Sequence, residues 1–159
     1  MKKIVLSRVL LLLLTIGWMT MIFGFSAQTG EESGDLSAII SEPITAVLVS
    51  LDGDVTAAEQ QTLYFQVDGI VRMGAHFAEY AVLGVLLCLF QQSFGSGRFV
   101  IAWLIGVGYA VADEIHQAFT PDRMCDPVDV LIDASGLLLG AVCIHYLTKI
   151  WRKKHVHNP

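Results

Sequence analysis

Cysteine, proline and nucleotide-binding motifs are all scarce or missing in this chain of 159 residues. Three cysteines are too few and too scattered for a disulfide framework or a zinc site. Cys88 and Cys143 lie in apolar runs and are expected to be small packing residues, whereas Cys125 would be a lone thiol on a loop. We find no Walker loop, no dinucleotide fingerprint, no internal repeat and no low-complexity tract. With a net charge of −5, a nucleic-acid partner is not expected.

Apolar residues are what the chain has in excess. They make up 54% of it, and the mean hydropathy is +0.60, whereas a soluble domain has roughly 45–50% apolar residues. The length suits a single domain over residues 1–159. We therefore predict an all-α polytopic membrane protein.

Four apolar runs predict a bundle of four transmembrane helices, with spans at about 4–25, 73–90, 99–119 and 128–147. The third run is uninterrupted only from Phe99 to Ala112, which is shorter than the roughly 20 residues that a crossing needs. To span, its helix must continue through the polar residues that follow, to about Phe119.

Basic residues are nearly absent from one side of this predicted topology. Only Arg72 and Arg123 fall there, while the following residues fall on the other side: Lys2, Lys3, Arg8, Arg98, Lys149, Arg152, Lys153 and Lys154. Short loops rich in Lys and Arg stay cytoplasmic, so both termini are expected inside the cytoplasmic membrane. All fifteen Asp and Glu residues then fall on the outer half. The alternative that the first span is a cleaved signal peptide leaves the other spans oriented the same way.

The segment 26–71 between the first two spans is the long polar stretch, and it predicts two amphipathic extracytoplasmic helices. Pro43 suits the first turn of one helix. The second has an apolar face of Leu63, Val67, Ile70 and Val71, and Asp54 or Thr56 could cap its start. The helices would lie on the bilayer surface or over the bundle; a lid over a site is the alternative.

Carboxylates occur at matched depth on three predicted spans. At a rise of about 1.5 Å per residue, Glu79, Asp113 and Asp133 each lie roughly 7–9 Å in from the outer end of their helix. A charge that faces lipid is unfavourable, so these side chains should face one another or a water-filled cavity.

Helical spacing places further polar residues on the same faces. The residues that share these faces are His76, Glu79 and Tyr80; Asp113, His116 and Gln117; and Asp129, Asp133, Gly136 and Gly140. The last two form a small-xxx-small contact, so the carboxylate face is also a packing face.

Several of these residues also have purely structural explanations. Asp126 and Pro127 form a capping pair, and Asp129 would favour the helix dipole. His116 could be a hydrogen-bonded core residue. Glu114 could face a loop or a cation, and Arg123 could either neutralise carboxylates or hold an anion.

Four sequence blocks resemble the VanZ-like family. They are FSAQ at 25–28, R-x-x-x-H-F-A-E-Y-x-V-L-G at 72–84, D-E-I-H-Q-x-F-x-P-x-R at 113–123 and D-V-L-I-D-x-x-G at 129–136. The resemblance implies a bacterial cell-envelope membrane protein, with an effect on susceptibility to the glycopeptide teicoplanin. The chain departs from the family pattern at Met73-Gly74, Asp122 and Cys125, which bears on loop shape and substrate preference.

A recessed cluster of His and carboxylates suits proton transfer, so we predict an outward-facing polar pocket. The candidate catalytic residues are His76, Glu79, Asp113, Glu114, His116, Asp129 and Asp133. The candidate substrate-binding residues are Ser26, Gln28, Arg72, Tyr80, Gln117 and Arg123. Hydrolysis or group transfer on an envelope lipid or peptidoglycan-precursor head group is the leading hypothesis.

Two other functions stay open at this point. One is a binding or shielding protein that performs no chemistry, and the other is a proton-coupled transporter, which the uncharged inner halves of the spans disfavour. No cofactor is expected. The same ligands could bind a divalent metal, although their spacing matches no specific metal motif. The sequence does not indicate an oligomeric state.

Overall fold

The computed structural model describes residues 2–95, 99–123 and 125–156, with side chains as far as Lys154. Its five α-helices follow one another without any strand among these residues. They are α1 (Lys2–Ser26), α2 (Gly30–Asp52), α3 (Ala57–Gln92), α4 (Phe99–Gln117) and α5 (Pro127–Val156). The predicted all-helical class is therefore confirmed.

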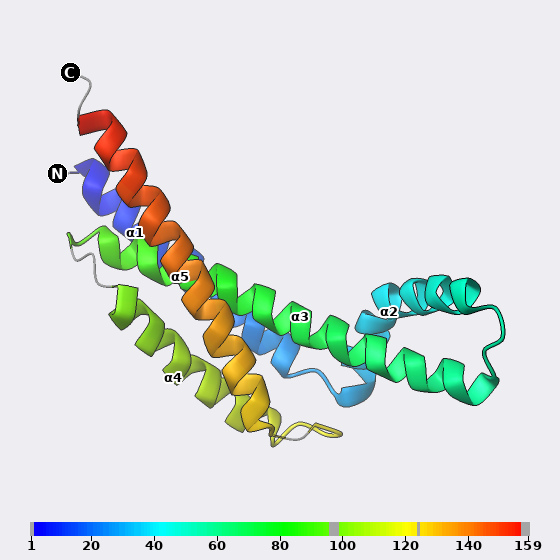
Figure 1. The fold of residues 1–159 in the computed structure, drawn as a ribbon. Helices are drawn as coiled ribbons and strands as arrows, with labels where there is room; N and C mark the ends of the chain where they lie inside the picture. The colour runs from blue at the N-terminus through cyan, green and yellow to red at the C-terminus, as the bar shows by residue number, and fades with distance from the viewer. Residues whose placement is uncertain (1, 96–98, 124, 157–159) are drawn as a thin grey trace.

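The helices form a core and an arm (Figure 1). The core consists of α1, residues 73–92 of α3, α4 and α5, and its buried apolar cluster draws on all four helices, with Ile22, Leu83, Ala110 and Leu137 as examples. The arm consists of residues 30–71, that is, α2 packed against the first half of α3. With 36 residues, α3 is about 54 Å long, well beyond the ~30 Å of a bilayer's hydrocarbon layer.

The count of four membrane helices is not matched. All five helices are long and apolar enough to cross a membrane by length and composition. We expected a separate surface helix before the second span, but α3 runs unbroken through Val71, Arg72 and Met73. No Pro interrupts it, and its first turn is closed by the capping box of Thr56 and Glu59. Of the two caps considered for this helix, Thr56 is the one that the structure confirms.

The start of α2 also differs from expectation. We placed a helix start at Pro43, but α2 begins at Gly30 and Pro43 lies in its interior. The Thr29 hydroxyl accepts from the Glu32 amide at 3.2 Å, and the Glu32 carboxylate accepts from the Thr29 amide at 2.9 Å. This capping box satisfies backbone donors that would otherwise be unpaired at a helix start.

The polar end of the third predicted span is helical, as its length required. Helix α4 continues through Asp113, Glu114 and His116 and ends at Gln117, two residues before the expected end at Phe119. Helix α5 extends beyond the predicted span of 128–147 and carries its basic residues on the added turns.

Glycines bring α3 and α5 into close contact. A Cβ added at Gly136 would collide with the Phe77 carbonyl, and one at Gly140 with the Ala81 carbonyl. A Cβ at Gly84 would likewise collide with the Leu137 carbonyl. The small-residue contact predicted for Gly136 and Gly140 is confirmed, and α3 supplies a third glycine to it.

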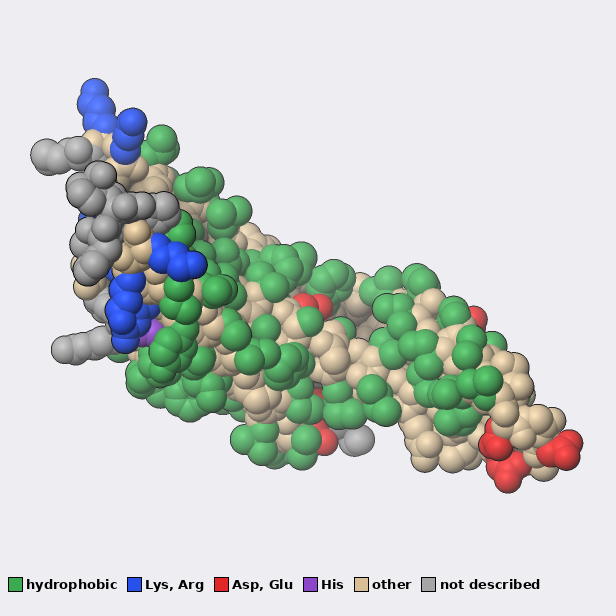
Figure 2. Space-filling model, turned by 45° about the horizontal axis from the view of Figure 1, so that its top comes forward, with side chains coloured by type: hydrophobic (Ala, Val, Ile, Leu, Met, Phe, Trp, Pro, Cys, Tyr) green, Lys and Arg blue, Asp and Glu red, His purple; other side chains and the backbone are tan. Residues whose placement is uncertain are grey.

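Charges separate along the molecule. Lys and Arg side chains gather at one end, where α1 begins and α5 ends, while Asp and Glu lie in the middle and at the tip of the arm (Figures 1 and 2). We call the end where α1 begins and α5 ends the basic end. We call the opposite end of the core, where α1 and α4 end and α5 begins, the site end. Arg98, which we counted on the basic side, lies outside the described residues.

Candidate functional site

A cavity of about 280 Å³ lies where the arm joins the core. We call it the first cavity. Its lining includes six predicted site residues: Ser26, Gln28, Arg72, His76, Glu79 and Arg123. The remaining wall is largely apolar and comes from Phe25, Leu36, Ile40, Val71 and Ala75, with Ser33 and Ser37 of α2. The site end therefore contains a pocket in which cations and a His–carboxylate group adjoin an apolar surface.

A second cavity of about 300 Å³ shares part of this wall. Arg72, His76 and Arg123 line both cavities. The second cavity adds the carboxylates of Asp68 and Asp129, with Phe65, Gly69 and Met73. The two arginines thus stand between a mostly apolar space and an acidic one.

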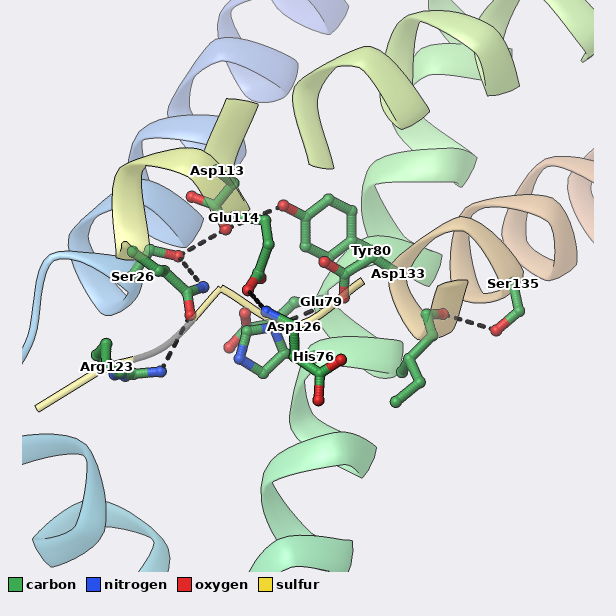
Figure 3. A network of polar contacts seen from close by, with 12 residues as sticks. Ser26, His76, Glu79, Tyr80, Asp113, Glu114, Arg123, Asp126, Asp133 and Ser135 are labelled. Atoms are coloured by element: carbon green, nitrogen blue, oxygen red, sulfur yellow. Dashed lines mark hydrogen bonds and ion pairs between the residues drawn. The ribbon is translucent and has the colours of Figure 1, made fainter. Parts of the chain in front are cut away.

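His76 and Asp133 form a pair that links α3 to α5 (Figure 3). His76 Nδ1 lies 3.5 Å from Asp133 Oδ1, and the Asp133 side chain is only 2% exposed. This separation is longer than a well-formed hydrogen bond, so a small movement would close it. Since Nδ1 faces the carboxylate, Nε2 is the ring nitrogen left to meet a ligand.

A chain of side-chain hydrogen bonds runs from the buried core to the cavity wall (Figure 3). The hydroxyls of Tyr80 and Ser26 both donate to Asp113 Oδ2, at 3.1 and 2.6 Å. The Ser26 hydroxyl accepts from Gln117 Nε2 at 3.2 Å, and Gln117 Oε1 accepts from Arg123 Nη1 at 3.3 Å. We call this the polar chain. It joins α1, α3, α4 and the loop after α4, and it positions Arg123 at the cavity.

Glu114 serves the loop between α4 and α5. Its carboxylate accepts from the Asp126 backbone amide at 2.6 Å, and the Asp126 carboxylate accepts from the Val128 amide at 2.9 Å. The capping role considered for Asp126 is confirmed, and Glu114 holds the residue that performs it. Neither residue lines the two cavities.

His116 lies apart from the other candidates. Its ring stacks on Phe23 of α1, with centroids 4.3 Å apart, and it lines neither cavity. The predicted residues therefore divide into three groups. Ser26, Gln28, Arg72, His76, Glu79, Asp129 and Arg123 line a cavity; Tyr80, Asp113, Glu114, Gln117 and Asp133 are buried behind it; and His116 packs against α1.

Sequence reasoning missed the contribution of α2. Ser37, Ser41 and Thr45 recur every four residues and are buried toward α3, and the Ser41 hydroxyl donates to Asp68 at 2.9 Å. Thr29 and Glu32 match the capping-box pattern three residues apart, which was the available signal for a helix starting here. It also missed Trp18, whose indole donates to the Glu79 carbonyl at 2.9 Å.

The two arginines form a positively charged part of the wall. Burial lowers the pKa of Arg123, and the nearby Arg72 cation lowers it further, but a guanidinium remains charged at physiological pH. Within the described ranges, the one ion pair is His76 with Asp133. Neither arginine is therefore paired directly with a carboxylate, and both can receive an anion.

A divalent metal was left open by the mixture of His and carboxylates. Over the described residues, no three His, Cys, Asp or Glu side chains gather as a metal-binding group. Metal binding by these side chains stays a prediction.

The comparisons with known proteins give one match. A family model described as VanZ/LLP1 matches residues 11–150, which include every candidate site residue. No curated protein and no solved structure matches the chain.

Proposed function

Since the chain belongs to the VanZ/LLP1 family, we propose that it is a multi-pass membrane protein of the bacterial envelope with an outward-facing reactive pocket. It acts by hydrolysis or group transfer on the head group of an envelope lipid or peptidoglycan precursor. The observation that carries this proposal is the His76–Asp133 pair, whose histidine lines the same cavity as Arg72 and Arg123. Any effect on teicoplanin susceptibility would follow from the altered head group.

In this proposal the core helices cross the membrane and the arm lies outside. The amide of Gly30 donates to the Pro121 carbonyl at 3.2 Å, so α2 starts at the level of the loop after α4. From there α2 runs along the part of α3 that projects away from the core (Figure 1). A core crossing of about 20 residues uses the second half of α3, which leaves α2 beyond the bilayer. With the basic end cytoplasmic, the pocket faces outside.

The cavity residues suit attack of water or a hydroxyl on an anionic ester. His76 Nε2 would take the proton of the attacking group, while Asp133 orients the ring and stabilises its charged form. The attacking oxygen forms a bond to the phosphorus or carbonyl carbon, and the ester bond breaks. Glu79, also on the cavity wall, would give a proton to the leaving oxygen. Arg72 and Arg123 would hold the anionic group.

The test is a lipid analysis of membranes that contain the wild-type chain, Glu79→Gln or Asp133→Asn. We expect the wild-type chain to change the lipid or precursor profile, as read by mass spectrometry. Each variant should convert the lipid or precursor roughly 10²–10⁴-fold more slowly. Asp54→Asn, at the exposed tip of the arm, is the matched control and should behave as wild type. An unchanged profile with folded wild-type protein would refute the catalytic proposal.

One observation favours a second candidate, a protein that binds or shields a head group without chemistry. Asp113 and Glu114, two of the predicted catalytic carboxylates, are buried in structural hydrogen bonds rather than lining a cavity. For such a protein, protection would scale with the amount of protein present, and the lipid profile would stay the same.

A further inference from the structure

The two cavities present three kinds of wall in a fixed order. The first cavity offers mainly apolar side chains together with Glu79, the shared wall offers two guanidinium groups and His76, and the second cavity offers two carboxylates. A zwitterionic phospholipid carries the complementary groups in the same order, namely hydrocarbon, phosphate and ammonium. We propose that the preferred ligand of this site is an aminophospholipid, an inference that rests on the proposed function of the pocket as a lipid head-group site.

The apolar wall is open on the side where a chain would leave. Leu36 and Ile40 of α2 are 46% and 54% exposed, and Phe25 at the end of α1 is 41% exposed. All three line the first cavity. Because α1 is a core helix, Phe25 lies at the level where the proposed bilayer begins. A hydrocarbon chain can therefore lie along Phe25, Leu36 and Ile40 between the bilayer and the cavity.

The phosphate position is set by Arg72 and Arg123. Both line both cavities, and they lie near enough for the Arg72 cation to lower the pKa of Arg123. The Nε atom of Arg123 is buried without a hydrogen-bond partner. A phosphodiester between the two guanidiniums would supply that acceptor and relieve their repulsion.

The ammonium position is set by Asp68 and Asp129, which line the second cavity. Asp68 accepts one hydrogen bond from Ser41, which fixes a carboxylate oxygen and leaves the group able to accept more. Among the residues that the structure describes, no Lys or Arg forms an ion pair with either carboxylate. The cavity of about 300 Å³ has room for an aminoethyl group. A glycerol head group, which is uncharged, would place no ammonium beside these carboxylates.

The experiment measures which lipid the purified full-length chain retains. The chain in detergent micelles is given an equimolar mixture of phosphatidylethanolamine, phosphatidylglycerol and phosphatidic acid with identical acyl chains, and retained lipid is read by native mass spectrometry. We expect phosphatidylethanolamine to be retained about tenfold better than the other two, the factor expected of one charge-assisted contact. Equal retention of the three lipids, or preference for either of the others, would overturn the proposal.

Two double variants assign the contacts. Asp68→Asn with Asp129→Asn should keep total lipid retention and lose the preference for the amine, since Asn at 68 can still accept from Ser41. Arg72→Gln with Arg123→Gln should reduce retention of all three lipids together. Asp54→Asn and Arg152→Gln, at the tip of the arm and at the basic end, are the controls. A preference that survives the Asp-to-Asn pair would refute the assigned ammonium site.

This result is separable from that of the proposed function. Asp133 lines neither cavity, so Asp133→Asn should retain phosphatidylethanolamine as wild type does while failing to convert any lipid. Selective retention without conversion by the wild-type chain would refute the reaction and leave the ligand assignment standing. Conversion of a lipid without preference for the amine would refute the ligand assignment and leave the reaction standing.

Discussion

At the scale of single residues, the ionisable groups of the site perform two different tasks. Arg72, His76 and Glu79 reach the cavity, whereas Asp113 and Glu114 hold neighbouring elements in place. The sequence predicted that Glu79, Asp113 and Asp133 lie at similar depth, but it could not show which of the ionisable groups would be satisfied by a partner. That distinction depends on tertiary neighbours such as Ser26, which comes from a different helix.

Ser26→Ala tests the polar chain. It removes the donor to Asp113 and the acceptor for Gln117, leaving a buried carboxylate oxygen less satisfied, so we expect a loss of about 1–3 kcal/mol in stability. The thermal unfolding midpoint in detergent, followed by circular dichroism, measures it. Ser50→Ala removes an exposed hydroxyl that bonds only within its own helix and should change the midpoint little. Equal effects of the two variants would contradict a supporting role for the chain.

At the scale of helices, close packing of α3 on α5 determines where His76 and Asp133 meet. Gly136 lies one turn after Asp133 and presses against the carbonyl of Phe77, which is next to His76. The histidine and the carboxylate are therefore placed by the same contact that joins the helices. The spacing of Asp133, Gly136 and Gly140 predicted this shared face correctly.

Gly140→Ala should destabilise the protein, because its Cβ would overlap the Ala81 carbonyl. The cost expected for overpacking is about 1–3 kcal/mol. Gly108→Ala is the matched control, since a Cβ there meets nothing within 4 Å and an alanine in a helix interior is favourable by roughly 0.5–1 kcal/mol. The two variants should shift the unfolding midpoint in opposite directions. A downward shift of equal size in both would argue against the close contact.

The sequence predicted the core helices better than the arm. Long apolar runs signal a membrane helix through composition alone. The predicted ends of α1, α4 and α5 therefore lie within two residues of the observed ends, except at the basic C-terminal extension of α5. The arm was harder because α2 mixes acidic and apolar residues and contains Pro43. Proline usually marks a helix start, and here tertiary packing against α3 outweighs that preference. The wall that α2 gives to the first cavity was missed for the same reason.

At the scale of the whole molecule, the separation of charge predicts an orientation in the membrane, and the cysteines allow that orientation to be tested. Cys88 is buried, and Cys125 is exposed in the loop at the site end. Cys143 is also exposed, on the surface of α5, in the stretch that the proposal places within the bilayer. If the site end faces outside, a membrane-impermeant maleimide added to intact cells should label the chain once, and Cys125→Ser should abolish labelling. Cys143→Ser is the control and should leave labelling unchanged. If Cys125 is labelled only after the cells are opened, the proposed orientation is wrong and the site end faces the cytoplasm.

The unbroken course of α3 has a mechanical consequence. The helix carries Thr62 near the tip of the arm and Glu79 at the pocket on one continuous backbone, with no proline between them. Glu79 lies between Phe77 and Ala81, the two residues of α3 that press on Gly136 and Gly140 of α5. The arm and this carboxylate are therefore parts of one rod that is anchored at the glycine contact, and the arm cannot tilt without bending α3 or shifting α5.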